Sequence, residues 1–162
     1  MRRALVILLS LWGAGASAQD AEIFQQCMRD EKLEHLSPCF YRVADACHAQ
    51  TQTPAATDAF CDGRETRFWD ALIVTLDEEL ELSLGGEALT AYRRDKALWA
   101  SLDCAFPFQH LQGEGAGGAR CALEKAQTRA AHLGKWVTYA RRCAFVGQPN
   151  CETYAGQAGT NE

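Results

Sequence analysis

The stretch Phe68-Trp69-Asp70-Ala71-Leu72-Ile73-Val74-Thr75-Leu76-Asp77-Glu78-Glu79-Leu80-Glu81-Leu82-Ser83-Leu84 decides the fold. Its apolar residues recur every three or four positions, which is the spacing of one face of an α-helix. The acidic residues between positions 77 and 81 fall mostly on the opposite face. Gly85-Gly86 follows, and glycine commonly ends a helix. We therefore predict a long helix that begins at Thr57 or Asp58. The residues expected on its buried face are Phe68, Leu72, Ile73, Leu76, Leu80 and Leu84.

The spacing of apolar residues predicts four further helices. A first short helix covers residues 21–34. A second starts at Ser37-Pro38 and runs toward His48, because serine is a favoured helix cap and proline suits the first helical position. The last two helices cover residues 87–110 and 119–145. The candidates for their buried faces are Leu89, Tyr92, Trp99, Leu102, Phe106, Leu123, Ala126, Leu133, Trp136, Val137 and Ala140.

The sequence has neither the alternation of apolar and polar residues typical of strands nor an internal repeat or a long linker. The fold that we predict is all-α: a small disulfide-stapled bundle of about five helices, two short and N-terminal and three longer. A single helical domain spans residues 19–147. Residues 148–162 are expected to form a partly disordered C-terminal tail.

The N-terminus has the three parts of a secretory signal. Arg2 and Arg3 are followed by an apolar run over residues 4–12, and Ala16-Ser17-Ala18 suits cleavage before Gln19. The apolar run is too short to cross a bilayer of about 30 Å as a helix. We predict a signal peptide over residues 1–18, a periplasmic or secreted protein, and no membrane anchor after signal cleavage.

The charge of the chain argues against acidic partners. The formal net charge is −5, and loss of residues 1–18 removes two arginines and no acid, which brings the mature chain to −7. Such a chain has no basic surface for nucleic acid or for anionic lipid. Basic protein partners are favoured, although the same acidity also aids solubility.

All eight cysteines follow the predicted cleavage site, and an even number in an exported chain indicates disulfides. No Cys-x-x-Cys pair occurs, and the four histidines have no zinc-ligand spacing relative to the cysteines. We therefore predict a disulfide framework, with no metal and no cofactor. The cysteines are Cys27, Cys39, Cys47, Cys61, Cys104, Cys121, Cys143 and Cys151.

Two bridges are predicted from sequence neighbours that flank a turn. Bonded cysteines have Cα atoms within about 7 Å of each other. Cys104 and Cys121 flank the glycine-rich residues 113–118, and a bridge between them would join the last two helices. Cys143 and Cys151 would pin the C-terminal tail to the last helix.

The pairing among the four N-terminal cysteines is less constrained. Cys39 and Cys47 lie about 12 Å apart on one predicted helix, so they are not expected to pair with each other. Cys27–Cys47 with Cys39–Cys61 is slightly preferred, because residues 27 and 47 are equidistant from the turn at Ser37-Pro38. Cys27–Cys39 with Cys47–Cys61 also suits the hairpin geometry.

Two groups of residues carry a resemblance to a known family. The first is Cys61-x-x-x-Glu65-x-x-x-Trp69-Asp70-x-Leu72, preceded by Cys39 and Cys47. The second is Cys104-Ala105-Phe106, the glycines of residues 113–118, Cys121 and Thr128-Arg129-Ala130-x-x-Leu133. In order and spacing they resemble the lysozyme inhibitor LprI-like proteins of bacterial envelopes. The resemblance covers residues 27–136 and implies a protein partner, a lysozyme or another cell-wall hydrolase.

The motif residues Glu65, Trp69, Asp70 and Arg129 have structural interpretations. Glu65 and Asp70 are five positions apart and do not face each other as residues three or four apart would, so a paired acid and base is not expected. Trp69 lies beside the apolar stripe and is expected in the core. Glu65 is expected either in an ion pair on the helix surface or bonded to the connection before the second helix. Asp70 is expected to accept a bond from Arg129 or Arg67.

The sequence shows no carrier for nucleophilic catalysis, because no serine has a His/Asp context and the cysteines are predicted to be oxidised. We expect no catalytic residue and no enzyme. The glycine-rich loop lacks the Lys-Ser/Thr of a phosphate loop. It is either a closed disulfide loop in which glycines permit tight turns, or a partner-binding loop. In the second interpretation, residues 111–119 occlude the cleft of a lysozyme. The residues assigned to that role are Gly113, Glu114, Gly115 and Gly117.

The function that we expect is that of a protein-binding module outside the cytoplasm, an inhibitor of lysozyme or of a related muramidase. The alternative is a structural or assembly factor of the cell envelope that does not bind lysozyme. Recovery of a cell-wall enzyme from periplasm with this protein would separate the two.

Overall fold

The described part of the chain folds into five α-helices and one short 3₁₀ helix. The computed structural model describes residues 18–50, 55–102 and 117–146, and no strand occurs within those ranges. The predicted all-α fold of about five helices is confirmed. The elements are α1 (Ala18–Asp30), η2 (Ser37–Cys39), α2 (Arg42–Gln50), α3 (Ala55–Ser83), α4 (Gly86–Ser101) and α5 (Gly117–Val146).

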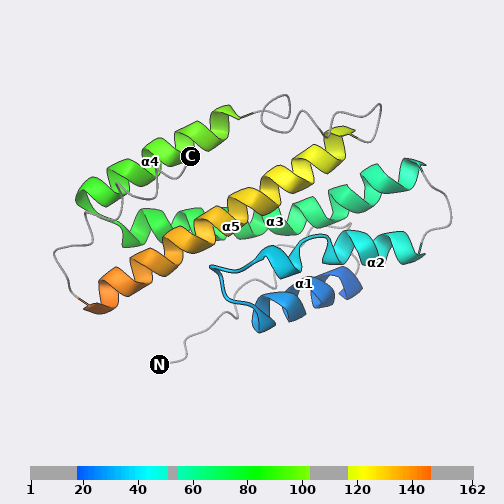
Figure 1. Cartoon of the computed structure of the whole chain (residues 1–162), viewed down its shortest axis with the longest axis horizontal. Coiled ribbons are helices and arrows are strands. Elements are labelled where there is room, and N and C mark those ends of the chain that lie inside the picture. The colour runs from blue at the N-terminus through cyan, green and yellow to red at the C-terminus, as the bar shows by residue number, and fades with distance from the viewer. Residues whose placement is uncertain (1–17, 51–54, 103–116, 147–162) are drawn as a thin grey trace.

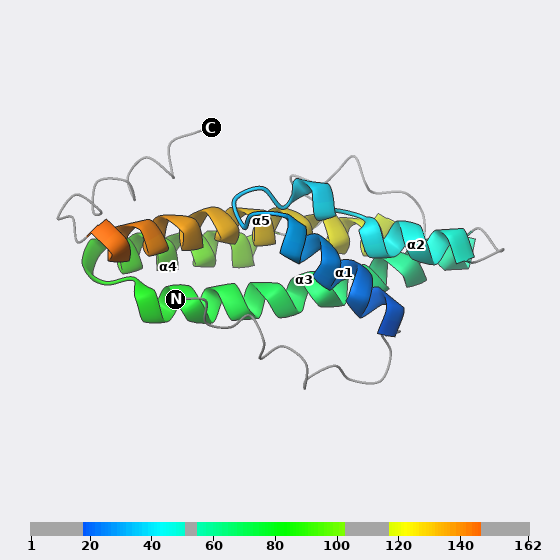
Figure 2. The same ribbon diagram turned by 90° about the horizontal axis from the view of Figure 1, so that it is seen from below.

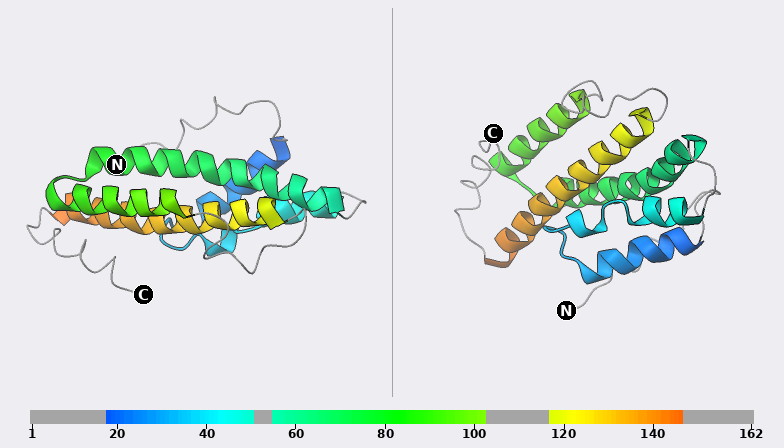
Figure 3. Two further views of the ribbon diagram at one scale, coloured as in Figure 1. Left: turned by 90° about the horizontal axis from the view of Figure 1, so that it is seen from above. Right: turned by 45° about the vertical axis from the view of Figure 1, so that its right-hand side comes forward.

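The two long helices α3 and α5 form the centre of the molecule (Figure 1). Helices α1 and α2 cover one side of this pair, and α4 lies on the other side (Figures 2 and 3). The apolar stripe predicted for α3 faces α5, with Ile73 and Leu84 half-buried and its other members buried. The residues that form this core are Phe68, Leu72, Leu76, Leu80, Leu123, Ala126, Leu133, Trp136, Val137 and Ala140.

Helix α1 packs on α3 through aromatic rings. The ring of Phe24 stacks on Phe68 with 5.3 Å between centroids and meets Trp69 edge-on at 5.0 Å. Such ring pairs add to the free energy gained by burying their area. At the start of α1, the buried carboxylate of Asp20 accepts a hydrogen bond of 2.7 Å from Arg64 of α3.

Two disulfides fix this side of the bundle, and they correct the preferred pairing. Cys27 is bonded to Cys39 and Cys47 to Cys61, with Cα separations of 5.6 and 5.5 Å. The slightly preferred pairs, Cys27–Cys47 and Cys39–Cys61, are wrong, and the alternative is the one observed. Because η2 is separate from α2, Cys39 turns back toward α1 while Cys47 faces α3.

The second predicted helix is interrupted, which the sequence did not indicate. The chain forms the 3₁₀ turn Ser37–Cys39, becomes extended at Phe40, and has a positive φ of 64° at Tyr41 before α2 begins. A residue with a side chain is rarely stable in that left-handed conformation unless its surroundings hold it there.

Helix α4 is shorter than predicted. It ends at Ser101, and Leu102 is extended, with its carbonyl oxygen bonded by Lys125 of α5. Tyr92 is buried as expected, whereas Leu89 and Trp99 are only half-buried. Residues 103–110 of the predicted helix, with Phe106, lie outside the described residues.

Helix α5 runs through the positions predicted for it. Near its middle, the segment between α1 and η2 crosses so closely that a Cβ on Gly134 would collide with the carbonyl oxygen of Leu33. Glycine is required at this position because only a residue without a side chain admits such an approach.

Candidate functional site

The carboxylate of Glu65 is fully buried where α2, α3 and α5 meet, and it caps α2. One oxygen accepts the backbone N–H groups of Val43 at 3.0 Å and Ala44 at 2.8 Å. The other accepts the backbone N–H of Tyr41 at 2.8 Å. The first N–H groups of a helix have no partner within that helix. Glu65 therefore supplies from α3 the cap that α2 lacks, and it holds Tyr41 in its unusual conformation.

Two side chains complete the environment of Glu65. The indole of Trp69 donates to it at 2.8 Å and the amide of Gln127 at 2.7 Å, so five donors surround one carboxylate. Of the two interpretations of Glu65, the structure shows the bond to the connection before α2. Trp69 is fully buried in the core, as expected. These two motif residues therefore hold the fold together rather than line a surface.

Asp62 is a second buried carboxylate, one turn before Glu65 on α3, and its surroundings differ. One of its oxygens lies 3.0 Å from Nε of Arg120, but neither oxygen accepts an aligned hydrogen bond. Burial raises the pKa of Asp62, and the charge of Arg120 only partly opposes that rise. Nothing in the sequence distinguishes this acid from its neighbour.

The other two motif residues, Asp70 and Arg129, line one groove of about 490 Å³ among α3, α4 and α5, which we call the polar groove. Desolvation by the groove walls raises the pKa of the Asp70 carboxyl. No residue of the described ranges donates a hydrogen bond to Asp70, so the bond predicted from Arg129 or Arg67 is wrong. The other charged or aromatic residues of this groove are Asp77, Lys96, Trp99 and Lys125.

Arg129 joins the three helices from the wall of the polar groove. Its guanidinium donates to Asp95 of α4 at 2.7 Å, lies 3.5 Å from Asp77 of α3, and sits 5.5 Å from the centre of the Trp99 ring. Asp95 also lies 3.0 Å from the ring nitrogen of His132. Burial alone would raise the pKa of Asp95, but the bonds from His132 and Arg129 outweigh it and hold that pKa below its usual range.

Helix α4 is attached to α3 mainly through further polar contacts. The buried Tyr92 donates its hydroxyl to Asp77, and burial together with that carboxylate raises the pKa of Tyr92. Lys96 lies 3.4 Å from Asp77, and Arg93 donates to Glu81 at 2.7 Å. The α4 side of the bundle thus depends on charge far more than the α1 side does.

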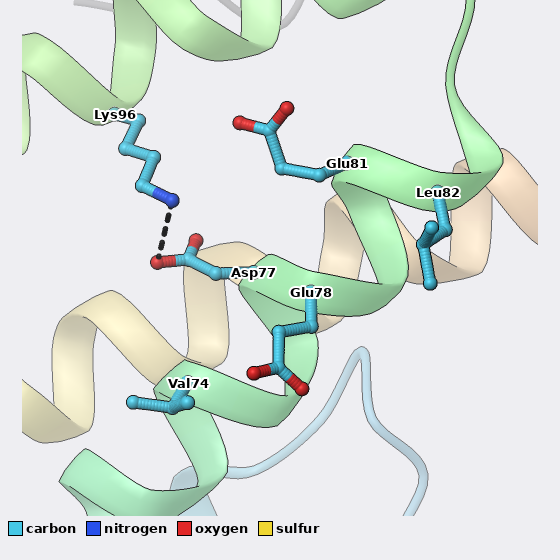
Figure 4. A pocket seen from close by; sticks show the side chains of 6 residues that line it. All are labelled: Val74, Asp77, Glu78, Glu81, Leu82 and Lys96. Atoms are coloured by element: carbon cyan, nitrogen blue, oxygen red, sulfur yellow. Dashed lines mark ion pairs between the residues drawn. The ribbon is translucent and has the colours of Figure 1, made fainter.

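A second groove of about 450 Å³ lies along the outer surface of α3 beside α4 (Figure 4). We call it the acidic groove. Figure 4 shows three carboxylates around its apolar side chains, with Lys96 pointing from α4 toward Asp77. The residues that line it are Val74, Asp77, Glu78, Glu81, Leu82 and Lys96.

The cationic side chains of the polar groove are paired with other groups of the fold. Within residues 18–50, 55–102 and 117–146, no group of three His, Cys, Asp or Glu side chains is placed to hold a metal ion. The cations of the polar groove are engaged: Arg129 and Lys96 by carboxylates, and Lys125 by the Leu102 carbonyl. These cations are therefore already paired within the fold.

Most of the predicted partner-binding loop lies outside the part of the chain that the structure describes. Gly113, Glu114 and Gly115 lie outside the described residues, and Gly117 is the first residue of α5. Cys121, one turn into α5, is buried and disulfide-bonded, and Cys143 near the other end is half-buried and also disulfide-bonded. Their predicted mates, Cys104 and Cys151, also lie outside the described residues, so these two pairings stay predictions.

The sequence indicated that Tyr92 is buried, but it did not indicate which charged residues attach α4 or where the grooves beside it lie. Asp77, Tyr92 and Asp95 are brought together only by the register between helices, which periodicity along one helix does not give. A weak signal exists for the acidic groove: Val74 and Leu82 are apolar residues on the acidic side of α3, two turns apart.

No protein-family model matches the chain, and neither a curated protein nor a solved structure matches it. Among the helices described, none combines the length and the hydropathy that crossing a bilayer requires.

Proposed function

We propose that the chain is an extracytoplasmic protein-binding module and that its partner is a lysozyme or another cell-wall hydrolase. The observation that carries the proposal is the buried, disulfide-bonded Cys121 in the first turns of α5. It is a covalent anchor next to the segment that the sequence assigns to partner contact. A segment tied to a stiff scaffold loses less conformational freedom on binding, which favours affinity.

Three other features support the same function. The predicted signal peptide and the disulfides suit a protein that works outside the cytoplasm. The resemblance to LprI-like proteins implies a lysozyme partner. The charge of −7 expected for the mature chain suits basic lysozymes of the chicken type, because opposite charges speed association and favour the correct partner. In the proposed mechanism, residues 111–119 enter the glycosidase cleft and Glu114 contacts cationic groups at its rim.

A lysozyme panel tests the proposal. The mature chain from Gln19 is assayed against chicken-type, goose-type and invertebrate-type enzymes, for both inhibition and binding. Glu114→Lys should weaken inhibition by at least about 10-fold. Glu22→Lys is the matched control, because Glu22 is exposed on α1 and gives the same change of charge. Absence of inhibition and of binding for all three types at micromolar protein rejects the proposal, and recovery of a different envelope protein from periplasm would favour an assembly factor instead.

A further inference from the structure

The acidic groove exposes large apolar side chains that the fold does not use. Val74 is 56% exposed and Leu82 is 89% exposed, and they lie two turns apart on α3. Single exposed apolar residues are ordinary on protein surfaces, but apolar residues gathered in one groove with a polar rim are typical of interaction sites. Figure 4 shows both side chains on the outer turns of α3, with carboxylates between and beside them.

The rim of this groove is negative, and part of that charge is available to a ligand. Glu78 is exposed and has neither a hydrogen bond nor an ion pair with any residue of the described ranges. Arg93 bonds Glu81 and lowers the pKa of that carboxyl, so Glu81 is ionised at neutral pH. The last turn of α3 contains no basic residue, and the carbonyl groups at a helix C-terminus add partial negative charge.

We infer that the acidic groove is a docking surface for a basic, amphipathic helix of a protein partner. Its apolar face would cover Val74 and Leu82, and its lysine or arginine side chains would pair with Glu78 and Glu81. Helices commonly bind in this way, with apolar anchors at helical spacing in a groove. A second copy of this chain does not fit, because its surface is acidic overall and would place carboxylates against carboxylates. An anionic membrane surface is excluded by the same repulsion.

This inference rests on the proposed function only in treating the chain as a protein-binding module, since the groove is separate from residues 111–119. The probe is a synthetic peptide of about 14 residues, four helical turns, built from leucine and lysine so that one face is apolar. Its binding to the mature chain is measured by calorimetry at low and at high salt. We expect saturable one-to-one binding that weakens as salt rises.

Matched variants locate the binding. Glu78→Lys should weaken the peptide by about 10-fold, and the control Glu22→Lys, which changes the net charge equally, should have little effect. Val74→Ser with Leu82→Ser should weaken it by a similar factor without any change of charge. Arg93→Gln should strengthen it, because Glu81 then loses its competing partner. All five positions are exposed, so the overall fold should be retained, which circular dichroism checks.

Several results would overturn the inference. They are absence of saturable binding, equal effects of Glu78→Lys and Glu22→Lys, no effect of the double serine variant, and self-association in sedimentation that Leu82→Ser abolishes. The lysozyme panel separates this inference from the proposed function. If the native mature chain inhibits lysozyme but does not bind the peptide, the docking surface alone is rejected. If it binds the peptide but neither binds nor inhibits any lysozyme, the proposed partner alone is rejected.

Discussion

The two sides of the α3–α5 pair are held by different forces. On the α1 and α2 side, aromatic stacking, two disulfides and a buried carboxylate with five donors fix the chain. On the α4 side, ion pairs in which at least one partner is partly exposed hold the helix, among them the buried Arg129 with Asp95 and the partly exposed Lys96 with Asp77. Covalent bonds and buried hydrogen bonds are little affected by salt. Interactions between partly exposed charges weaken as the salt concentration rises. The α1 and α2 side should therefore be the more stable part of the fold. The attachment of α4 should weaken as the salt concentration rises.

The largest effect is expected at Glu65. Glu65→Gln places an amide group against backbone donors and removes the charge that five hydrogen bonds share, and we expect a loss of about 3–5 kcal/mol in the free energy of unfolding. Denaturant unfolding measures it. Trp69→Phe removes one of the five donors and should lower the free energy of unfolding by about 1 kcal/mol. This milder variant allows the measurement if Glu65→Gln does not fold. Equal stability of Glu65→Gln and the native chain would show that Glu65 is not the cap of α2.

The contrast between periodicity and long-range contact explains what the sequence could predict. The stripe from Phe68 to Leu84 follows from one helix alone, so the length of α3 and its buried face were predictable. The break at Tyr41 was not, because the group that stabilises it, Glu65, lies 24 positions away. The N-terminal disulfides were ambiguous for a related reason: both pairings suit a hairpin, and only the interruption before α2 decides between them.

The candidate site was predictable only in part. The motif drew attention to Asp70 and Arg129, and both line the polar groove. Their partners depend on how far α4 slides along α3 and α5, and no pattern within α4 fixes that register. The loop at residues 113–117 stays a prediction, since the structure describes only its last residue.

A second large effect on the scaffold side is expected at Gly134. Gly134→Ala places a Cβ against the carbonyl of Leu33, so the backbone must move. We expect the free energy of unfolding to fall by about 2–3 kcal/mol. Gly63→Ala on α3 is the matched control, because the Cβ that it adds meets no atom within 4 Å beyond its own stretch of helix backbone. In that control the free energy of unfolding should rise by about 0.5–1 kcal/mol, because alanine has a higher helix propensity than glycine. Thermal unfolding of the two variants should therefore shift in opposite directions, and a shift in the same direction contradicts the close approach.

On the α4 side, Arg129→Met is expected to lower the free energy of unfolding by about 1–2 kcal/mol, which is less than the effect of breaking a fully buried ion pair. The effect is smaller because Asp95 still contacts His132 and Asp77 still contacts Lys96. The loss should depend on pH. The pKa of Asp95 is depressed in the folded chain, so its contribution is present above the unfolded pKa near 4 and is lost as pH falls through the folded value. The variant and the native chain should therefore converge in stability in strong acid. A difference that is independent of pH would mean that Arg129 acts through packing alone.

The smallest effect, and the sharpest comparison, is expected at Asp62, three positions from Glu65 on the same face of α3. Asp62→Asn removes a buried charge that accepts no aligned hydrogen bond, so the change at neutral pH should stay within about 1 kcal/mol and can be a gain. Because burial raises the pKa of Asp62, the native chain binds this proton more tightly when folded, and its stability gains from this group as pH falls through the raised pKa. Asp62→Asn should lack that acid-side gain, which urea unfolding between pH 7 and about pH 4 measures. A large loss at neutral pH would mean that the contact with Arg120 supports α5 as firmly as Glu65 supports α2, and the two buried carboxylates would then be equivalent.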